Sequence, residues 1–173
     1  MNIAGSQEIT IDLDAVRVWR MISDVTRTSE WSPDVILSVW LDPGPTVGAR
    51  FESINRMPIV RRWRSLSTVT AADPGRRFAF AVGPNPDDPN TTWAWDLEPT
   101  SEGTTVRLSY EMRHEPGIVL LYYRLTRRSE RVRKSVAATL RRLKAVTERP
   151  DPDPGSRPRE AVAGRPSCCR RDR

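Results

Sequence analysis

Residues 35 to 112 consist almost entirely of short alternating segments separated by turn residues, and no helical pattern interrupts them. Within most segments apolar and polar side chains alternate, which is the period of a strand with one buried face. Turn signals such as DPGPTVG at 42–48 and DPGR at 73–76 separate the segments. Consecutive strands without intervening helices favour an antiparallel sheet.

The sequence predicts seven strands in all. A strand at 6–13 precedes a short helix that Asp14 caps and that ends near Asp24. A second short helix around Thr28 must stop before Pro33, because proline forces the residue before it out of the α region. Six strands follow, in the segments VILSVWL, ARFESIN, VRRWRSLSTVTA, FAFAV, TTWAWDLEP and EGTTVRLSYEM.

The last predicted element is one long helix after Pro116 and Gly117. Its apolar residues recur at three-, four- and seven-residue spacing: Ile118, Tyr122, Leu125, Val132, Val136, Leu140 and Leu143. This stripe needs a surface to cover, and the sheet supplies one. The predicted class is therefore α+β, a seven-stranded curved antiparallel sheet wrapped around a long C-terminal helix, with two short helices between the first two strands.

Composition divides the chain near residue 149. Residues 1–149 have the length and apolar content of one domain. Residues 150–173 carry five prolines and no apolar period, so we expect a disordered Pro/Arg-rich tail. Residues 117–149 carry 10 basic and 2 acidic side chains. Most of these basic side chains lie opposite the apolar stripe, which favours a solvated face over a specific nucleic-acid surface and leaves weak binding to anionic surfaces open.

Several kinds of site lack support in the sequence. No apolar run reaches the roughly 18 residues of a membrane helix, and the N-terminus has no secretory signal, so we expect a cytoplasmic protein. Cys168 and Cys169 are neighbours far from the single histidine, His114, so we expect no metal site. Neither G-x-G-x-x-G nor a Walker A loop occurs, so no cofactor is expected. The oligomeric state is not indicated.

Several strings within residues 6–147 resemble the START-like (SRPBCC) superfamily of helix-grip proteins, and most of all its polyketide cyclase/dehydrase-like members of actinobacterial type. The strings are DVTRTSEWSP, VGARFESIN, VTAADPGRRFAF, TTWAWDLEP and GTTVRLSYE. The resemblance implies an internal cavity between the sheet and the C-terminal helix. It is unspecific for the substrate, because the fold hosts aromatase/cyclases, lipid carriers and hormone receptors.

The candidate cavity residues are mostly aromatic. Inward-reading strand positions hold Phe51, Trp63, Phe78, Phe80, Trp93, Trp95 and Tyr110. Such rings either fill the core or form a wall for a flat polycyclic or lipid-like guest. By resemblance, Trp31 lies near the cavity mouth, where it is a packing plug or a lid. On the predicted helix, Tyr122 and Leu125 would face the cavity.

Polar candidates lie beside these rings. Asn55 shares a strand face with Phe51, and an inward amide must be hydrogen-bonded to protein, water or ligand, so it is the candidate polar anchor. Ser65 and Ser67 could line the pocket with it. The same alternation sends Arg56 to solvent.

Three functional hypotheses follow. The first is binding of a hydrophobic small molecule, polyketide- or lipid-like, in the internal cavity. The alternative is a polyketide cyclase/dehydrase-type enzyme without a recognisable catalytic triad, which would fold a flexible chain into a reactive shape while Tyr110 donates to an enolate oxygen. The second alternative is binding of a partner or an anionic surface through the basic helix.

Overall fold

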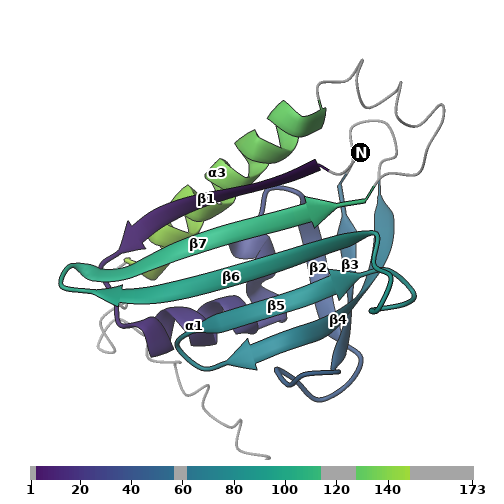
Figure 1. The fold of residues 1–173 in the computed structure, drawn as a ribbon, viewed down its shortest axis with the longest axis horizontal. Helices are drawn as coiled ribbons and strands as arrows, with labels where there is room; N and C mark the ends of the chain where they lie inside the picture. The colour runs from purple at the N-terminus through teal and green to yellow at the C-terminus, as the bar shows by residue number, and fades with distance from the viewer. Residues whose placement is uncertain (1–2, 57–61, 114–127, 149–173) are drawn as a thin grey trace, which may run out of the picture.

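The computed structural model describes residues 3–56, 62–113 and 128–148 (Figure 1). Its helical elements are α1 (Ala15–Ser23), the 3-10 helix η1 (Val25–Glu30) and α3 (Arg128–Thr147). Its strands are β1 (Ile3–Ile11), β2 (Val35–Trp40), β3 (Arg50–Asn55), β4 (Trp63–Asp73), β5 (Arg77–Val82), β6 (Thr91–Thr100) and β7 (Gly103–Met112). The helical prediction for 118–127 and the predicted tail lie outside the described residues.

The seven strands form one antiparallel sheet in the order β1-β7-β6-β5-β4-β3-β2 (Figure 1). Strands β2 to β6 each pair with the next strand along the chain, as the uninterrupted alternating segments predict. Strand β1 pairs with β7, with Ile3 opposite Met112 and Ile11 opposite Thr104. The predicted α+β class is confirmed, including the two short helices between β1 and β2.

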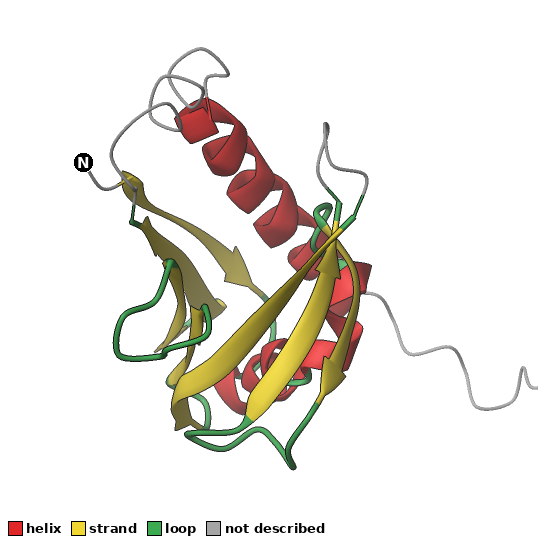
Figure 2. Cartoon of the chain, turned by 90° about the vertical axis from the view of Figure 1, so that its right-hand side faces the viewer, coloured by secondary structure: helices red, strands yellow, loops and turns green. Residues whose placement is uncertain are grey.

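Two irregularities bend the sheet. The pairing register shifts between Val35 and Leu37 on β2 and between Val69 and Ala71 on β4. A bulge of this kind bends its strand and increases the local twist. Figure 2 shows the result, since the strands curve around the side on which the helices lie.

Helix α1 begins where the sequence predicts. The carboxylate of Asp14 accepts an amide hydrogen bond from the first turn at 3.0 Å, the usual role of an N-cap. The helix buries Val18, Trp19 and Ile22. The indole Nε1 of Trp19 also donates to the backbone oxygen of Arg77 at 2.9 Å, which fixes α1 against the start of β5.

Helix α3 covers the concave side of the sheet with its predicted apolar stripe. Val136, Leu140 and Leu143 are at most 2% exposed, and Val132 is half-buried. Burial of side chains of this size removes apolar surface worth roughly 1.5–3 kcal/mol each from water. The stripe therefore holds α3 on the sheet along the described length of the helix.

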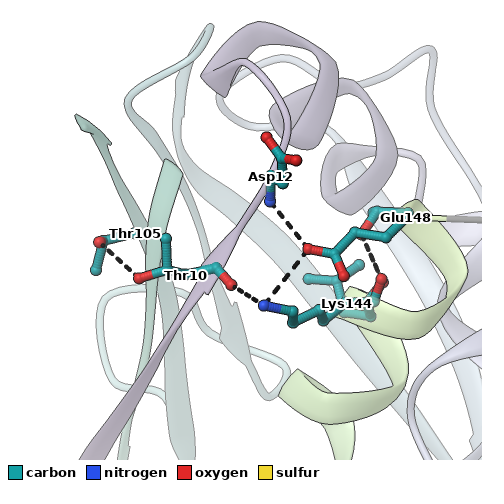
Figure 3. Close-up of polar contacts among 7 residues, drawn as sticks. Thr10, Asp12, Thr105, Lys144 and Glu148 are labelled. Carbon is teal, nitrogen blue, oxygen red and sulfur yellow. Dashed lines mark hydrogen bonds and ion pairs between the residues drawn. The ribbon is translucent and has the colours of Figure 1, made fainter. Parts of the chain in front are cut away.

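Polar contacts tie the C-terminal end of α3 to the end of β1 (Figure 3). The ammonium of Lys144 donates to the backbone oxygen of Thr10 at 2.8 Å. The carboxylate of Glu148 accepts from the backbone nitrogen of Asp12 at 3.0 Å and lies 3.4 Å from Lys144. Close to this end the interior is filled, because Ile11 and Leu143 are fully buried.

A glycine at the start of β7 tests this close packing. Gly103 has a φ of +119°, and a Cβ there would lie 2.2 Å from the backbone oxygen of Ile11. Gly48 is the matched control, because its φ is +88° but a Cβ there would meet nothing within 4 Å. We expect Gly48→Ala to lower the free energy of unfolding by about 1–2 kcal/mol through backbone strain. Gly103→Ala should lower the free energy of unfolding clearly more. If chemical denaturation gives equal losses for the two variants, this close packing is contradicted.

Candidate functional site

A cavity of about 330 Å³ lies between the concave face of the sheet, η1 and α3. Strands β2 to β7 all contribute to its wall. On β4, Ser65 and Ser67 line it whereas Val69 does not, and on β7 Leu108 and Met112 line it whereas Val106 does not. The cavity thus occupies the part of the concave face where β3 and β7 end, and the filled core occupies the rest.

Seven aromatic rings of the described residues line the cavity. The rings are those of Trp31, Phe51, Trp63, Phe78, Phe80, Trp93 and Trp95. Phe51 and Phe80 meet edge to face with their centroids 5.1 Å apart, and Phe78 lies 6.0 Å from Phe80. Edge-to-face contacts of this kind fix the orientation of neighbouring rings. The wall is therefore an ordered apolar surface that a flat or hydrocarbon guest could cover.

A row of serines crosses the neighbouring strands β2, β3 and β4. Ser38, Ser53 and Ser65 lie directly opposite one another on β2, β3 and β4. All three line the cavity and are buried, at 1%, 6% and 8% exposure. The hydroxyls of Ser38 and Ser53 are hydrogen-bonded at 2.8 Å. Ser67, two residues further along β4, is also buried and lines the cavity. We call these four residues the serine row.

The serine row has spare hydrogen-bonding capacity. The amide nitrogen of Asn55 donates to the hydroxyl oxygen of Ser65 at 2.9 Å, so this hydroxyl already accepts one bond. Within the described part of the chain, neither Ser65 nor Ser67 has an acceptor for its own proton. A buried polar group left unpaired costs roughly 1–3 kcal/mol. An oxygen atom of a guest or of a water molecule would remove that cost.

Asn55 joins the serine row to the rest of the wall. It is partly buried at the end of β3, and its amide nitrogen also lies 3.4 Å from the backbone oxygen of Ser53. Because Ser65 and Ser53 occupy that nitrogen, the atom that Asn55 can offer to a guest is its amide oxygen. The role of Asn55 as polar anchor stays a prediction, and in that role its amide oxygen would accept a hydrogen bond.

Trp31 is an inner wall of the cavity. It ends η1 and is 1% exposed. An ion pair links two residues of the segment before it. The guanidinium of Arg27 donates two hydrogen bonds of 2.7 Å to the carboxylate of Glu30. This pairing raises the pKa of Arg27. Unlike Trp19, Trp31 has no acceptor for its indole N–H among the described residues. Its packing against the cavity is established, whereas its role as a lid stays a prediction.

Most of the predicted site residues come together in this cavity. Eight of them line it: Trp31, Phe51, Asn55, Trp63, Ser65, Phe80, Trp93 and Trp95. Trp63 is the outermost, at 38% exposure. Tyr110 is buried but does not belong to the described lining, because its ring packs 5.6 Å from that of Trp93 and its hydroxyl lies over Gly5. Tyr122 and Leu125 lie outside the described residues.

The structure adds polar lining residues that the sequence analysis does not select. Ser38 on β2 is one of them. Ser53, its partner in the serine row, shares a face of β3 with Phe51 and Asn55, as the alternation predicts. Arg56 is exposed to solvent, as predicted, and it also belongs to the cavity lining. Strand β3 ends at Asn55, so the alternation no longer applies, and the exposed side chain of Arg56 lies at the rim of the cavity.

No group of three or more histidine, cysteine, aspartate or glutamate side chains lies together as a metal site would require within residues 3–56, 62–113 and 128–148. In the same part of the chain, no helix is both long and apolar enough to cross a bilayer.

The family model for polyketide cyclase / dehydrase and lipid transport matches residues 3–148. The chain belongs to this family. The match includes every strand of the sheet as well as α3. The helix-grip resemblance on which the sequence analysis relies is therefore confirmed.

Solved structures in this fold are similar to the chain. A polyketide cyclase-like protein of Corynebacterium glutamicum is 29% identical with a TM-score of 0.60, over 86% of this chain and 93% of that protein. The di-domain ARO/CYC StfQ of the steffimycin pathway is 17% identical with a TM-score of 0.67, over 84% of this chain and 50% of StfQ. A Mycobacterium smegmatis protein is 16% identical with a TM-score of 0.60, over 84% and 90%. No curated protein matches the chain significantly.

The serine pair offers a test of the cavity wall. We expect Ser38→Ala and Ser53→Ala each to lower the free energy of unfolding by about 1 kcal/mol, because each leaves the other hydroxyl without its partner. The double variant should cost less than the sum of the two, since no orphaned hydroxyl remains. Chemical denaturation of the four proteins measures this coupling. Strictly additive losses would show that the two hydroxyls do not depend on each other.

Proposed function

We propose that this protein binds an apolar, oxygen-bearing small molecule, polyketide- or lipid-like, in its internal cavity. The observation that carries the proposal is the combination of an ordered aromatic wall with a buried serine row that has unfilled hydrogen-bonding capacity. Ligand sites are concave and mostly apolar, with a few polar groups that fix orientation. The guest would lay its body on the rings and direct an oxygen atom to the serines.

Membership of the family supports this proposal at a coarse level, because the description of the family combines cyclase, dehydrase and lipid-transport members. The guest itself is not given by that description. The cytoplasmic location and the disordered tail expected from the sequence stay predictions.

A cyclase/dehydrase-type activity is the second candidate, and the serine row is the observation that favours it. Hydroxyls that donate to a carbonyl or enolate oxygen would stabilise the charge that develops when a polyketide chain cyclises. The aromatic wall would hold the chain in a folded shape and so reduce the entropic cost of the reaction. The position of Tyr110 outside the described lining makes the serines better candidates for this donor role.

Binding of an anionic surface through α3 is the third candidate. On the described part of the helix Arg133, Lys134, Arg141 and Arg142 are exposed, as expected for a solvated face. Such a role would depend on charge alone and would weaken steeply with salt.

Occupation of the cavity is tested with N-phenyl-1-naphthylamine, an uncharged dye that fluoresces when it leaves water. We expect saturable binding with a stoichiometry of one. Ser65→Phe places a ring into the cavity and should weaken binding at least about tenfold, because the added ring takes the volume of the guest. The control is Leu66→Phe, the neighbouring residue on the other face of β4, which should bind as the unmodified protein does. Equal binding by both variants would place the dye elsewhere.

The hydroxyl contribution is tested with two competitors of this dye, 2-acetylnaphthalene and 2-ethylnaphthalene, which differ by one carbonyl oxygen. We expect the ketone to bind about fivefold more tightly, since one net hydrogen bond contributes about 1 kcal/mol. The combined variant Ser65→Ala, Ser67→Ala should abolish this preference while leaving the affinity for 2-ethylnaphthalene intact. A preference that survives in this variant would contradict the role of the serines.

Native mass spectrometry of the protein purified from its own host addresses the identity of the guest. We expect a co-purified small molecule with a polyketide- or lipid-like mass, and Trp31→Ala should weaken its retention by removing an inner wall of the cavity. Retention that is unchanged in both Trp31→Ala and Asn55→Ala would argue against this cavity as the binding site.

A further inference from the structure

One corner of the cavity brings together two arginines around Asp34. The backbone nitrogen of Arg56 donates to the backbone oxygen of Asp34 at 2.7 Å. The carboxylate of Asp34 accepts a hydrogen bond from the hydroxyl of Ser135 on α3. Arg131 precedes Ser135 by four residues and so lies on the same face of the helix. All four residues line the cavity, and both arginines are exposed, so this corner is part of the cavity rim.

These two arginines differ from those that cover the outer face of the sheet. There the arginines pair with carboxylates, as in Arg50 with Asp42, Arg64 with Glu52, Arg77 with Asp96 and Arg107 with Glu8. Arg56 and Arg131 have no ion pair within the described residues, Asp34 included, whose carboxylate is bonded to Ser135. In this part of the chain the charged groups that line the cavity are therefore two cations and one anion.

We propose that this corner binds the carboxylate of the guest, and that the guest is an apolar acid whose body lies on the aromatic wall. The inference rests on the proposed binding function and narrows its ligand to a class, the monocarboxylic acids. Guanidinium groups present forked donors that match a carboxylate, and two of them would hold it from two elements, the end of β3 and the first described turn of α3.

The exposure of the corner suits such a head group. Arg56, Arg131 and Asp34 are all exposed, whereas the rings of Trp31, Phe51, Phe78 and Trp95 in the aromatic wall are buried. A carboxylate at the rim keeps part of its hydration, so the guest avoids the large cost of taking an ion into an apolar interior. The polarity of the lining would thus orient the guest. Its carboxylate would lie outermost, another oxygen atom would lie at the serine row, and its hydrocarbon body would lie against the rings.

The test compares 2-naphthoate with 2-naphthamide as competitors of N-phenyl-1-naphthylamine. The two molecules have nearly the same shape and differ in charge. We expect the unmodified protein to prefer the acid roughly five- to tenfold at low salt, as two partly exposed charge-assisted contacts would give. The preference should shrink at 0.5 M NaCl, where exposed charges are screened. Decanoate and decanamide form a second pair, and the pair that binds more tightly identifies the body of the guest as aromatic or aliphatic.

Arg56→Gln and Arg131→Gln should each reduce the acid preference at least about threefold and leave the amide affinity unchanged. Arg133→Gln is the matched control, because it removes the same charge from the same helix at an exposed position outside the described lining. The Arg133→Gln variant should prefer the acid over the amide as strongly as the unmodified protein does.

The outcomes separate the two proposals. If the dye, both amides and both acids all fail to bind, the cavity does not take guests and the proposed function itself is wrong. If the dye and the amides bind but neither acid is preferred, the binding function stands and the carboxylate site is wrong. An acid preference that Arg133→Gln reduces as strongly as the other two variants would also overturn the site, because net charge alone would then explain it.

Discussion

Small side chains at four inward positions of β2, β3 and β4 keep the interior of this protein from closing. In an antiparallel sheet the spacing of the strands is fixed by the backbone, so a serine where a larger apolar residue could stand leaves space that its neighbours cannot fill by moving closer. Ser38, Ser53, Ser65 and Ser67 stand together in this way. Elsewhere in the lining, the rings of Phe51, Phe78 and Phe80 contact one another, and Trp31 at the end of η1 is buried. The cavity exists because the serine side chains on one part of the concave face are small, while the aromatic rings on the rest hold one another in place.

Such an interior is maintained at a cost in stability, which the rest of the fold offsets. Buried hydroxyls contribute little to folding unless their partners are complete, and in the serine row only part of the network is internal. At the other end of the sheet the core is filled, and Lys144 and Glu148 tie α3 to the end of β1. The end with the filled core and the end that holds the cavity are thus separate parts of one sheet. A protein that only needed to fold would gain from apolar side chains in the row, and their absence is the physical reason to look for a ligand there.

The alternating pattern of the sequence predicts the strands, their order and the cap of α1, because these depend on local chemistry that one segment carries by itself. The cavity depends on which face of each strand points inward, and here local chemistry is ambiguous. On β2 the apolar residues Leu37 and Val39 are 46% and 40% exposed, whereas Ser38 between them is buried. Arg56 lies just past the end of β3, where alternation stops, and Tyr110 is buried without lining the cavity. Trp31 is buried despite polar neighbours. Each of these outcomes is decided by tertiary packing.

Binding and catalysis make different demands on the cavity wall, and the described lining meets those of binding more fully. Serine hydroxyls and indole N–H groups orient oxygen atoms, but at neutral pH they neither take up nor release protons readily without a base beside them. The charged residues of the described lining are Asp34, Arg56 and Arg131, and all three are exposed. A reaction in this cavity would therefore draw on the shape imposed on the guest and on fixed hydrogen-bond donors. Those same features hold a guest that leaves unchanged, so turnover distinguishes the two functions where affinity does not.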